Sequence, residues 1–208
     1  MKEKTNTATK TRKRVVVVAN GFFPFPLPRR HIIKAIEKYG FEARVIRFDL
    51  KNKRNVVTYS ATIACEVRMA RRRSGRRVDL ISTSMGAVAG LHAIMFNGIA
   101  DHVRRFVAAG APYDGSPVAA FFKHIGMLVG CEAPGQMTRG SPLLKRLKAT
   151  PLPQGPEYFS FGGLYDGTCP IPTHELEGAK NIRHPFSHKD IMFRSWFHGI
   201  ITELYLRE

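Results

Sequence analysis

Two kinds of hydrophobic pattern alternate along the chain. Short runs rich in valine, isoleucine and phenylalanine, typical of strands, alternate with longer segments whose apolar side chains recur at helical spacing. The short runs predict strands over residues 14–20, 41–48, 78–82, 105–109, 157–162 and 181–184. The longer segments predict helices over residues 30–39, 60–73, 85–96 and 189–206. Strands joined by helical crossovers pair in parallel, so this order predicts an α/β protein with a mainly parallel sheet and helices on both faces.

A serine turn stands where the third predicted strand meets its helix. In parallel sheets, binding and catalytic groups gather beyond the carboxyl ends of the strands. Residues 82–86 lie at such an end and read Ser-Thr-Ser-Met-Gly, with small residues two positions before and after Ser84. That spacing is typical of the strained turn that presents a nucleophilic serine, although a serine at the start of a helix is also a common N-cap. Ser84 is therefore the first candidate catalytic residue.

Five stretches of the sequence resemble α/β-hydrolases, and among these the small, nearly lidless bacterial lipases and esterases. The stretches keep the family's order and cover most of the chain after residue 14. They are VVVVANGFF at residues 15–23, LISTSMGAVAG at 80–90, FVAAGAPYDGS at 106–116, GSPLLKRL at 140–147 and the segment 158–193. The resemblance implies a three-layer sandwich with a small or absent lid, and a catalytic serine, acid and histidine in that order along the chain.

The resemblance also places an acid and a base for Ser84. Asp166 follows the predicted strand over 157–162, and His188 follows the last short strand. A serine hydroxyl needs a neutral imidazole to accept its proton, and a carboxylate holds that imidazole in the right tautomer. The resemblance therefore implies a relay of Ser84, His188 and Asp166. The residues that compete for the acid and base roles are Asp114, Asp190 and His184.

The other histidines are interpreted as structural. None has metal-ligand spacing with a cysteine or carboxylate partner, and they are His31, His92, His102, His124, His174 and His198. We also expect His184 to be packed or on the surface, because it falls within a predicted strand. The sequence implies no metal and no cofactor.

Backbone donors for a developing oxyanion are expected in two loops. They are the N–H groups of Met85, which follows Ser84, and of Phe22, in the loop after the first strand. Asn20-Gly21 stands where many α/β-hydrolases have His-Gly, a change that affects only how this loop is braced. Three prolines stiffen the rest of the loop, whose apolar side chains are expected to form an acyl-binding wall, namely Phe23, Phe25 and Leu27. The alternatives are a loop that packs on the first helix and a ligand for a proline-recognition domain.

A second apolar stretch, AAFFKHIGMLV at residues 119–129, admits three interpretations. It borders the acyl pocket, it forms a short cap over the site, or it is a buried core helix. The pattern of the sequence does not separate these three.

Length and composition limit the organisation of the chain. Its 208 residues, 44% of them apolar, suffice for one sizeable core. We expect a single domain over residues 14–208 and a basic arm over residues 1–13, which is either a solvated tail or a contact for nucleic acid or an anionic surface. The 3 cysteines lack the spacing of a zinc knuckle or a disulfide framework. No run is as long as a signal-peptide core or a membrane span, so we expect a cytoplasmic protein.

The positive charge is concentrated in one region. The formal net charge is +17 at pH 7, which implies anionic partners or substrates. Six arginines cluster between Arg68 and Arg77, with Arg104 and Arg105 near the next strand. Turns that lead into strands lie at the sheet edge opposite the carboxyl ends, so we expect the cluster to be remote from Ser84. It is a candidate for binding a membrane, an envelope polymer or nucleic acid, and the alternative is a solvated face that favours solubility.

The sequence therefore predicts a serine hydrolase that cleaves carboxylic esters, lipids among them, through an acyl-enzyme on Ser84. The same residues also serve thioesterases, amidases and acyltransferases. A polyanion-binding protein on an inactive hydrolase scaffold is the alternative from another class. The sequence makes no prediction of acyl chain length or oligomeric state.

Overall fold

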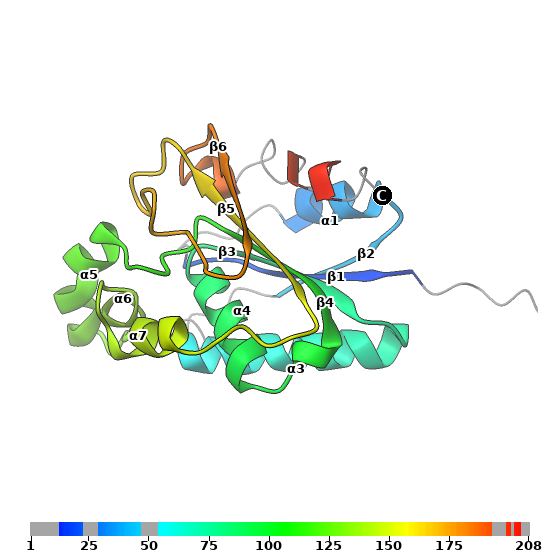
Figure 1. Ribbon diagram of the computed structural model, residues 1–208, viewed down its shortest axis with the longest axis horizontal. Coiled ribbons are helices and arrows are strands. Elements are labelled where there is room, and N and C mark those ends of the chain that lie inside the picture. Colours follow the sequence, from blue (N-terminus) through cyan, green and yellow to red (C-terminus); the bar gives the residue numbers. More distant parts are fainter. Residues whose placement is uncertain (1–12, 23–28, 47–53, 193–198, 201, 205–208) are drawn as a thin grey trace, which may run out of the picture.

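Six strands form one parallel sheet at the centre of the molecule (Figure 1). The computed structural model describes residues 13–22, 29–46, 54–192, 199–200 and 202–204. The strand order is β2-β1-β3-β4-β5-β6, and every neighbouring pair is parallel. The strands are β1 (Val15–Ala19), β2 (Glu42–Val45), β3 (Val78–Thr83), β4 (Val103–Ala109), β5 (Glu157–Gly163) and β6 (Lys180–His184).

Helices cover both faces of this sheet, which confirms the predicted α/β-hydrolase-like sandwich. On one face lie α3 (Val56–Ser74) and α4 (Met85–Phe96). On the other face lie α1 (Arg29–Glu37) and the C-terminal residues 199–200 and 202–204 (Figure 1). The crossovers between parallel strands thus supply both outer layers.

The central strands divide their side chains between two hydrophobic clusters. Along β1, Val15 and Val17 pack with α3 and α4, whereas Val16 and Val18 pack on the side of α1. Successive side chains of a strand point to opposite faces, so a strand between two helical layers is apolar at every position. This is why the sequence shows an unbroken valine run rather than an alternating pattern.

Three further helices lie together beyond the carboxyl ends of the strands, on the left of Figure 1. They are α5 (Pro117–Leu128), α6 (Ala133–Gln136) and α7 (Pro142–Ala149). Two short 3-10 helices, η1 (Ala100–His102) and η2 (Asp190–Met192), complete the described elements. No described helix is both long and apolar enough to cross a membrane.

The boundaries of α3 differ from the prediction because of its caps. The helix begins at Val56 instead of residue 60, since the Asn55 side chain accepts the N–H groups of Val57 (2.8 Å) and Thr58 (3.2 Å). It ends at Ser74, and the C-cap Gly75 has a φ of 71°, the left-handed conformation that glycine adopts most easily. The sequence prediction rested on apolar periodicity, which does not mark a capping asparagine, and it therefore placed the start of the helix too late.

One predicted helix, and one of the three interpretations of residues 119–129, are corrected by the structure. The chain over 190–192 forms η2 rather than the start of a long helix from residue 189, because the Asp190 side chain closes a turn with Ser187. Residues 199–200 and 202–204 are helical, and the remainder of the predicted segment lies outside the described residues. The buried-core interpretation of residues 119–129 is wrong, because α5 buries only Ala119 and Gly126.

The arginine cluster lies at the sheet edge opposite Ser84, as its position before β3 predicts. Part of it is structural, since Arg68 donates to the carbonyl of Asn97 and Arg77 donates to that of Val103. Other members, such as Arg72, are exposed. The expectation that this cluster binds a polyanion stays a prediction.

Candidate functional site

The strand order places a topological switch point between β1 and β3. Strand β1 pairs with β2 on one side and β3 on the other, so the chain leaves the two adjacent strands in opposite directions. Ligands of open α/β sheets bind at such a switch point, outside the carboxyl ends of the strands. Ser84 stands directly at this place, after the last residue of β3.

The turn after β3 holds Ser84 in a backbone conformation that few residues adopt. Its φ is 53° and its ψ is −128°, and among the described residues it is the only one besides glycine with a positive φ. Strain of this kind costs on the order of 1–3 kcal/mol and is retained where the surroundings enforce it. The side chain makes no capping hydrogen bond, so the interpretation of Ser84 as a helix-capping side chain is wrong. Its hydroxyl bonds instead to a histidine from a distant segment.

Glycines let the loops after β1 and β3 approach each other. A Cβ on Gly86 would lie 2.5 Å from the carbonyl oxygen of Ala19, and a Cβ on Gly21 would lie 2.6 Å from the Cβ of Ser84. Neither position has room for a side chain. The Gly21 N–H donates to the Thr83 hydroxyl (3.2 Å), which ties the two loops together. Contacts from both strands thus enforce the strained turn.

Two hydrogen bonds connect Ser84, His188 and Asp166. The Ser84 hydroxyl lies 3.0 Å from His188 Nε2, and His188 Nδ1 lies 2.8 Å from Asp166 Oδ2. An ionised carboxylate only accepts hydrogen bonds, so it holds the proton of a neutral imidazole on Nδ1 and leaves Nε2 as an acceptor for the serine proton. The Asp166 side chain is fully buried, and that of His188 is 14% exposed. The structure therefore brings together the three residues that the resemblance singled out.

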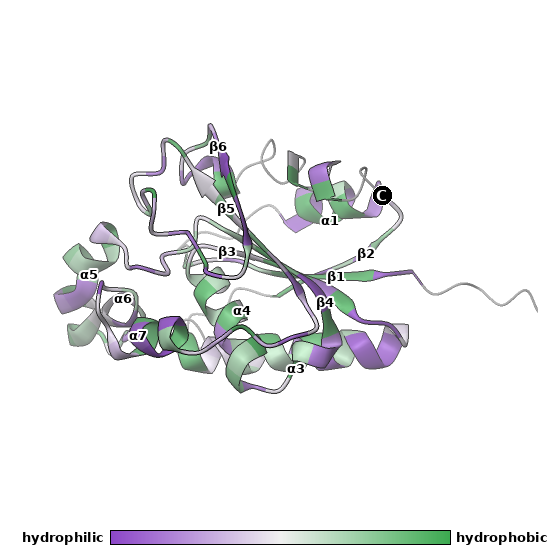
Figure 2. Ribbon diagram, in the orientation of Figure 1, coloured by the Kyte–Doolittle hydropathy of each residue, from purple (hydrophilic) through white to green (hydrophobic). Residues whose placement is uncertain are grey.

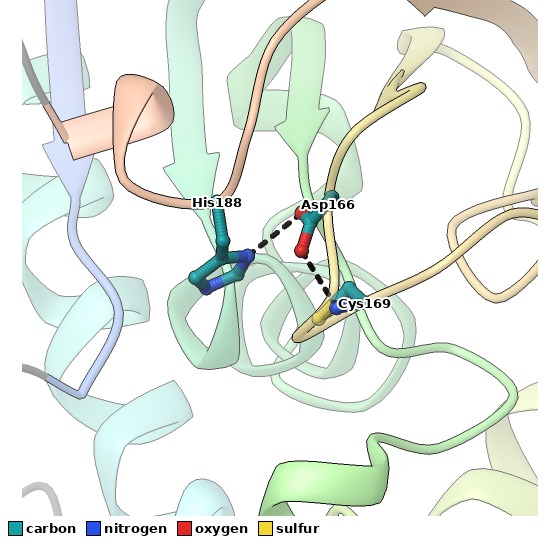
Figure 3. A group of neighbouring side chains, drawn as sticks. All are labelled: Asp166, Cys169 and His188. Carbon is teal, nitrogen blue, oxygen red and sulfur yellow. Dashed lines mark hydrogen bonds and ion pairs between the residues drawn. The ribbon is translucent and has the colours of Figure 1, made fainter.

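The loop after β5 holds the carboxylate of Asp166 from its other side. Asp166 Oδ1 accepts the backbone N–H groups of Thr168 (2.9 Å) and Cys169 (2.7 Å). Figure 3 shows the carboxylate between Cys169 and His188. The Ser116 hydroxyl donates to the carbonyl of Thr168 (2.7 Å) and links this loop to the start of α5. Charge-assisted bonds of this kind keep the carboxylate in one orientation.

The competing carboxylate Asp114 has other partners. It accepts hydrogen bonds from Arg139 (2.6 Å) and Lys148 (3.1 Å). Burial tends to raise the pKa of Asp114, but the hydrogen bonds and charges of Lys148 and Arg139 lower it overall. Asp114 is thus an ion-paired carboxylate of the loop after β4.

Asp190 and His184 are also engaged elsewhere. Asp190 accepts the N–H and the hydroxyl of Ser187, both at 2.7 Å, and these hydrogen bonds lower the pKa of its carboxyl group. His184 Nε2 lies 3.1 Å from Glu203, and its ring stacks on Phe161. His184 is therefore packed and partly exposed, as expected from its place in a strand.

The two expected oxyanion donors flank the serine. Met85 is the next residue and begins α4, and Phe22 follows Gly21 in the loop after β1. The Met85 side chain is buried, whereas that of Phe22 is 40% exposed. Their N–H groups stay predicted donors. The expected acyl wall of Phe23, Phe25 and Leu27 lies outside the described residues.

Two residues that the sequence did not single out brace the loop after β1. Thr83 accepts the Gly21 N–H, as described above, and the Tyr59 hydroxyl of α3 donates to the carbonyl of Asn20 (3.0 Å). Burial raises the pKa of Tyr59 far above its usual range, so its hydroxyl remains a donor. Thr83 lies inside the serine motif and is a polar residue in a buried strand, which is a signal in itself. Tyr59 lies on α3, far along the sequence from Asn20, and its contact with this loop is evident only in the folded chain.

One group of described side chains has the composition of a metal site. The ligand atoms of Asp166, Cys169 and His188 all lie within 4.8 Å of one another (Figure 3). Burial, and then the charge of Asp166, raises the pKa of Cys169 well above its usual range, so the thiol remains protonated. Asp166 and His188 are already bonded to each other. The chemistry of this group therefore fits a proton relay better than a metal ion, which prefers the thiolate.

Comparisons with known proteins place the fold. No family model matches the chain. No curated protein matches it either. The mature form of the Bacillus licheniformis lipase BlEst2 is similar in structure, with a TM-score of 0.77 and 18% identity over 93% of this chain and 92% of that one.

Two other solved structures extend the comparison. The metagenomic carboxyl esterase MGS0156 has a TM-score of 0.72 and 19% identity over 95% of this chain and 75% of its own. The monoacylglycerol lipase of Paleococcus ferrophilus has a TM-score of 0.63 and 14% identity over 93% of this chain and 94% of its own. The chain therefore has an α/β-hydrolase fold that resembles the small esterases, as the sequence motifs implied.

Proposed function

We propose that this protein is a serine hydrolase that cleaves carboxylic esters through an acyl-enzyme. The observation that carries the proposal is the pair of hydrogen bonds from Ser84 to His188 and from His188 to Asp166, at 3.0 and 2.8 Å. The strained turn at Ser84 supports it, because a structure tolerates such a conformation where a nucleophile must be presented. The similarity in fold to lipases and esterases favours esters over other acyl compounds.

In the first half of the reaction, Ser84 Oγ attacks the ester carbonyl carbon while His188 Nε2 accepts the hydroxyl proton. The carbonyl electron pair moves to its oxygen, and the N–H groups of Phe22 and Met85 stabilise that oxyanion. When the carbonyl re-forms, the bond to the alcohol oxygen breaks and His188 gives its proton to that oxygen. The alcohol leaves, and Ser84 carries the acyl group.

In the second half, water replaces the alcohol. His188 accepts a proton from the water as its oxygen attacks the acyl carbon, and a second oxyanion forms at the same place. Its collapse breaks the bond to Ser84, and His188 returns the proton to the serine. The carboxylic acid leaves and the resting enzyme is restored.

Asp166 acts on this cycle through His188. Its carboxylate keeps the Nδ1 proton in place and stabilises the imidazolium that forms when Nε2 accepts a proton. The N–H groups of Thr168 and Cys169 hold the carboxylate still, so the imidazole keeps its orientation through both halves. Asp166 does not itself need to be protonated.

A substitution within the serine motif tests the proposal. We expect Ser84→Ala to lose at least about a thousandfold in kcat on p-nitrophenyl esters of graded chain length, because no other group replaces the nucleophile. The matched control is Ser82→Ala, two residues away, whose buried hydroxyl has no hydrogen-bond partner among the described residues. The control should retain most of the activity.

Assays with other acyl substrates test which class of serine hydrolase the protein belongs to. Thioesters and amides with the same acyl group pass through the same acyl-enzyme, so a matched panel of the three substrate types measures which leaving group is preferred. We expect the ester to have the highest kcat/KM. Equal ester hydrolysis by Ser84→Ala and the native protein would overturn the proposal.

A further inference from the structure

Helix α5 buries its small residues and exposes its large ones. Only Ala119 and Gly126 are buried, and a Cβ on Gly126 would lie 2.7 Å from the carbonyl oxygen of Cys131. The large apolar side chains of the helix and its C-cap are exposed by 40% to 87%, namely Val118, Phe121, Phe122, Ile125, Met127, Leu128 and Val129. A helix that packs on a protein core normally does the opposite. Figure 2 shows the mostly hydrophobic colouring of α5 at the edge of the molecule.

The exposed side chains form an apolar surface whose contact with water is unfavourable. Phe121 is 75% exposed, Leu128 is 87% exposed, and the rings of Phe121 and Phe122 pack edge to face. Single exposed apolar residues are ordinary, but a contiguous group on one helix marks a binding surface. We call this set, from Val118 to Val129, the α5 surface.

Exposed basic side chains lie on α5 and on the segment beside its start, where the Ser116 N–H donates to the Met137 carbonyl. Lys123 is exposed on α5 itself, and four more exposed cations stand on or before α7, namely Arg139, Lys145, Arg146 and Lys148. Two acids lie nearby, Asp114, which pairs with Arg139 and Lys148, and Glu132, so these five cations outnumber the two carboxylates. The local charge is therefore positive. An apolar helix among cations matches the acyl region and the anionic headgroups of a lipid surface.

The α5 surface lies at the same edge of the molecule as Ser84. The N-cap of α5 is Ser116, whose hydroxyl donates to the Thr168 carbonyl (2.7 Å) in the loop that holds Asp166. Tyr165, next to Asp166 in that loop, is itself 71% exposed. The start of α5 is thus bonded to the loop of the proposed acid, and that loop also carries an exposed aromatic side chain.

We propose that the α5 surface docks this protein on an anionic lipid surface, with the carboxyl edge of the sheet toward the membrane. This differs from the sequence prediction, which assigned an anionic surface to the cluster between Arg68 and Arg77 at the opposite edge. Membrane binding itself does not depend on catalysis. Only its consequence, that lipid esters reach Ser84 from the bilayer, rests on the proposed function.

Vesicle binding tests the inference without activity. The probe is co-sedimentation of the full chain carrying Ser84→Ala with vesicles of phosphatidylcholine alone or mixed with phosphatidylglycerol. We expect binding to the mixed vesicles that weakens as salt rises, because the headgroup attraction is screened. Adding Phe121→Gln and Leu128→Gln should lower the partition coefficient about tenfold or more, since both side chains lose their place in the acyl region.

Matched controls distinguish vesicle binding by the α5 surface from nonspecific hydrophobic binding. Met69→Gln alters an apolar side chain on α3 that is 39% exposed and should leave binding unchanged. Lys145→Gln should weaken binding to the mixed vesicles only. Because the substituted side chains are exposed, circular dichroism should show the native fold in each variant.

Two outcomes would overturn the inference. One is equal vesicle binding with and without the two α5 substitutions, which would place the contact elsewhere. The other is a dimer of the native chain that Leu128→Gln converts to a monomer, measured by light scattering, since the α5 surface would then be covered by a second copy. Neither outcome bears on the role of Ser84, which the ester assay tests separately.

Discussion

At Ser84, backbone and side chain have separate tasks. In the proposed mechanism, the positive φ presents the hydroxyl, and the hydrogen bond to His188 Nε2 makes it a better nucleophile. The loop after β1 also has to stay in place, because an oxyanion donor on Phe22 acts only if its N–H lies next to the carbonyl oxygen of the substrate. Thr83 connects these two requirements, since its hydroxyl holds the Gly21 N–H one residue before Phe22.

Thr83 is therefore expected to position the loop. Thr83→Val keeps the shape but removes the acceptor, and we expect kcat on an ester to fall by up to about tenfold with KM little changed, the worth of one hydrogen bond. Thr83→Ser keeps the hydroxyl and should restore kcat. A KM effect alone, or the same loss in both variants, would argue for packing instead of positioning.

The proposed acid and base, Asp166 and His188, could be located from the sequence because the resemblance fixes their order after the strands. Their supports could not be located this way. Tyr59 meets Asn20 only because α3 crosses back over the sheet, and the N–H groups that hold Asp166 are backbone atoms, which leave no mark in the sequence. Side-chain chemistry is readable one residue at a time, whereas these contacts depend on the fold.

Among the elements, β1 and α4 were the easiest to predict. Every residue of β1 is buried and apolar, and α4 is buried from Met85 to Ile94, so burial itself determined their composition. Helix α5 has an equally apolar composition but lies exposed. The hydrophobicity of a segment indicates that its removal from water is favourable. It does not indicate whether the segment packs on its own chain or on a partner.

The junction between β1 and α4 should be the most sensitive to volume. Gly86→Ala puts a methyl group 2.5 Å from the carbonyl oxygen of Ala19 and 2.7 Å from that of Asn20, neither of which can move freely. We expect a loss of about 1–3 kcal/mol in the free energy of unfolding. Gly135→Ala on α6 is the control, since its nearest atom would be 3.8 Å away, and it should be neutral or slightly stabilising. Urea denaturation measures both, and equal stability of the two variants would contradict the close approach.

At the scale of the whole molecule, one buried histidine makes the free energy of unfolding depend on pH. His174 is fully buried, and neither ring nitrogen has a hydrogen-bond partner among the described residues. Burial, with a contribution from Arg183, lowers the pKa of His174 below its ordinary value of 6.5, although Glu175 and Asp166 oppose the shift. The unfolded chain therefore binds this proton more readily than the folded one.

Stability should fall as the solution is acidified. The contribution of His174 is complete above its ordinary pKa of 6.5 and is lost as pH drops below it, with a slope of at most about 1.4 kcal/mol per pH unit for one proton. His174→Leu should flatten that part of the profile in urea denaturation at a series of pH values. Because burial also lowers the pKa of His92, some acid sensitivity should remain. An unchanged slope in the variant would assign the effect to other groups.

The charges of the molecule also divide by location. Exposed arginines lie at the amino edge of the sheet, while α5 starts at the carboxyl edge, where its N-cap Ser116 bonds to the loop that holds Asp166. The sequence could show how many cations there are but not which edge combines them with exposed apolar side chains. That combination is what points to a lipid surface at the edge that holds Ser84.

The most direct test of the relay is the rate at which a fluorophosphonate labels Ser84, followed by intact-mass and peptide mass spectrometry in the native protein and in His188→Ala. An activated serine should form one adduct per chain, on Ser84 alone, and removal of the imidazole should slow labelling by about a hundredfold or more. Labelling at another residue, or an equal rate in both proteins, would contradict the account.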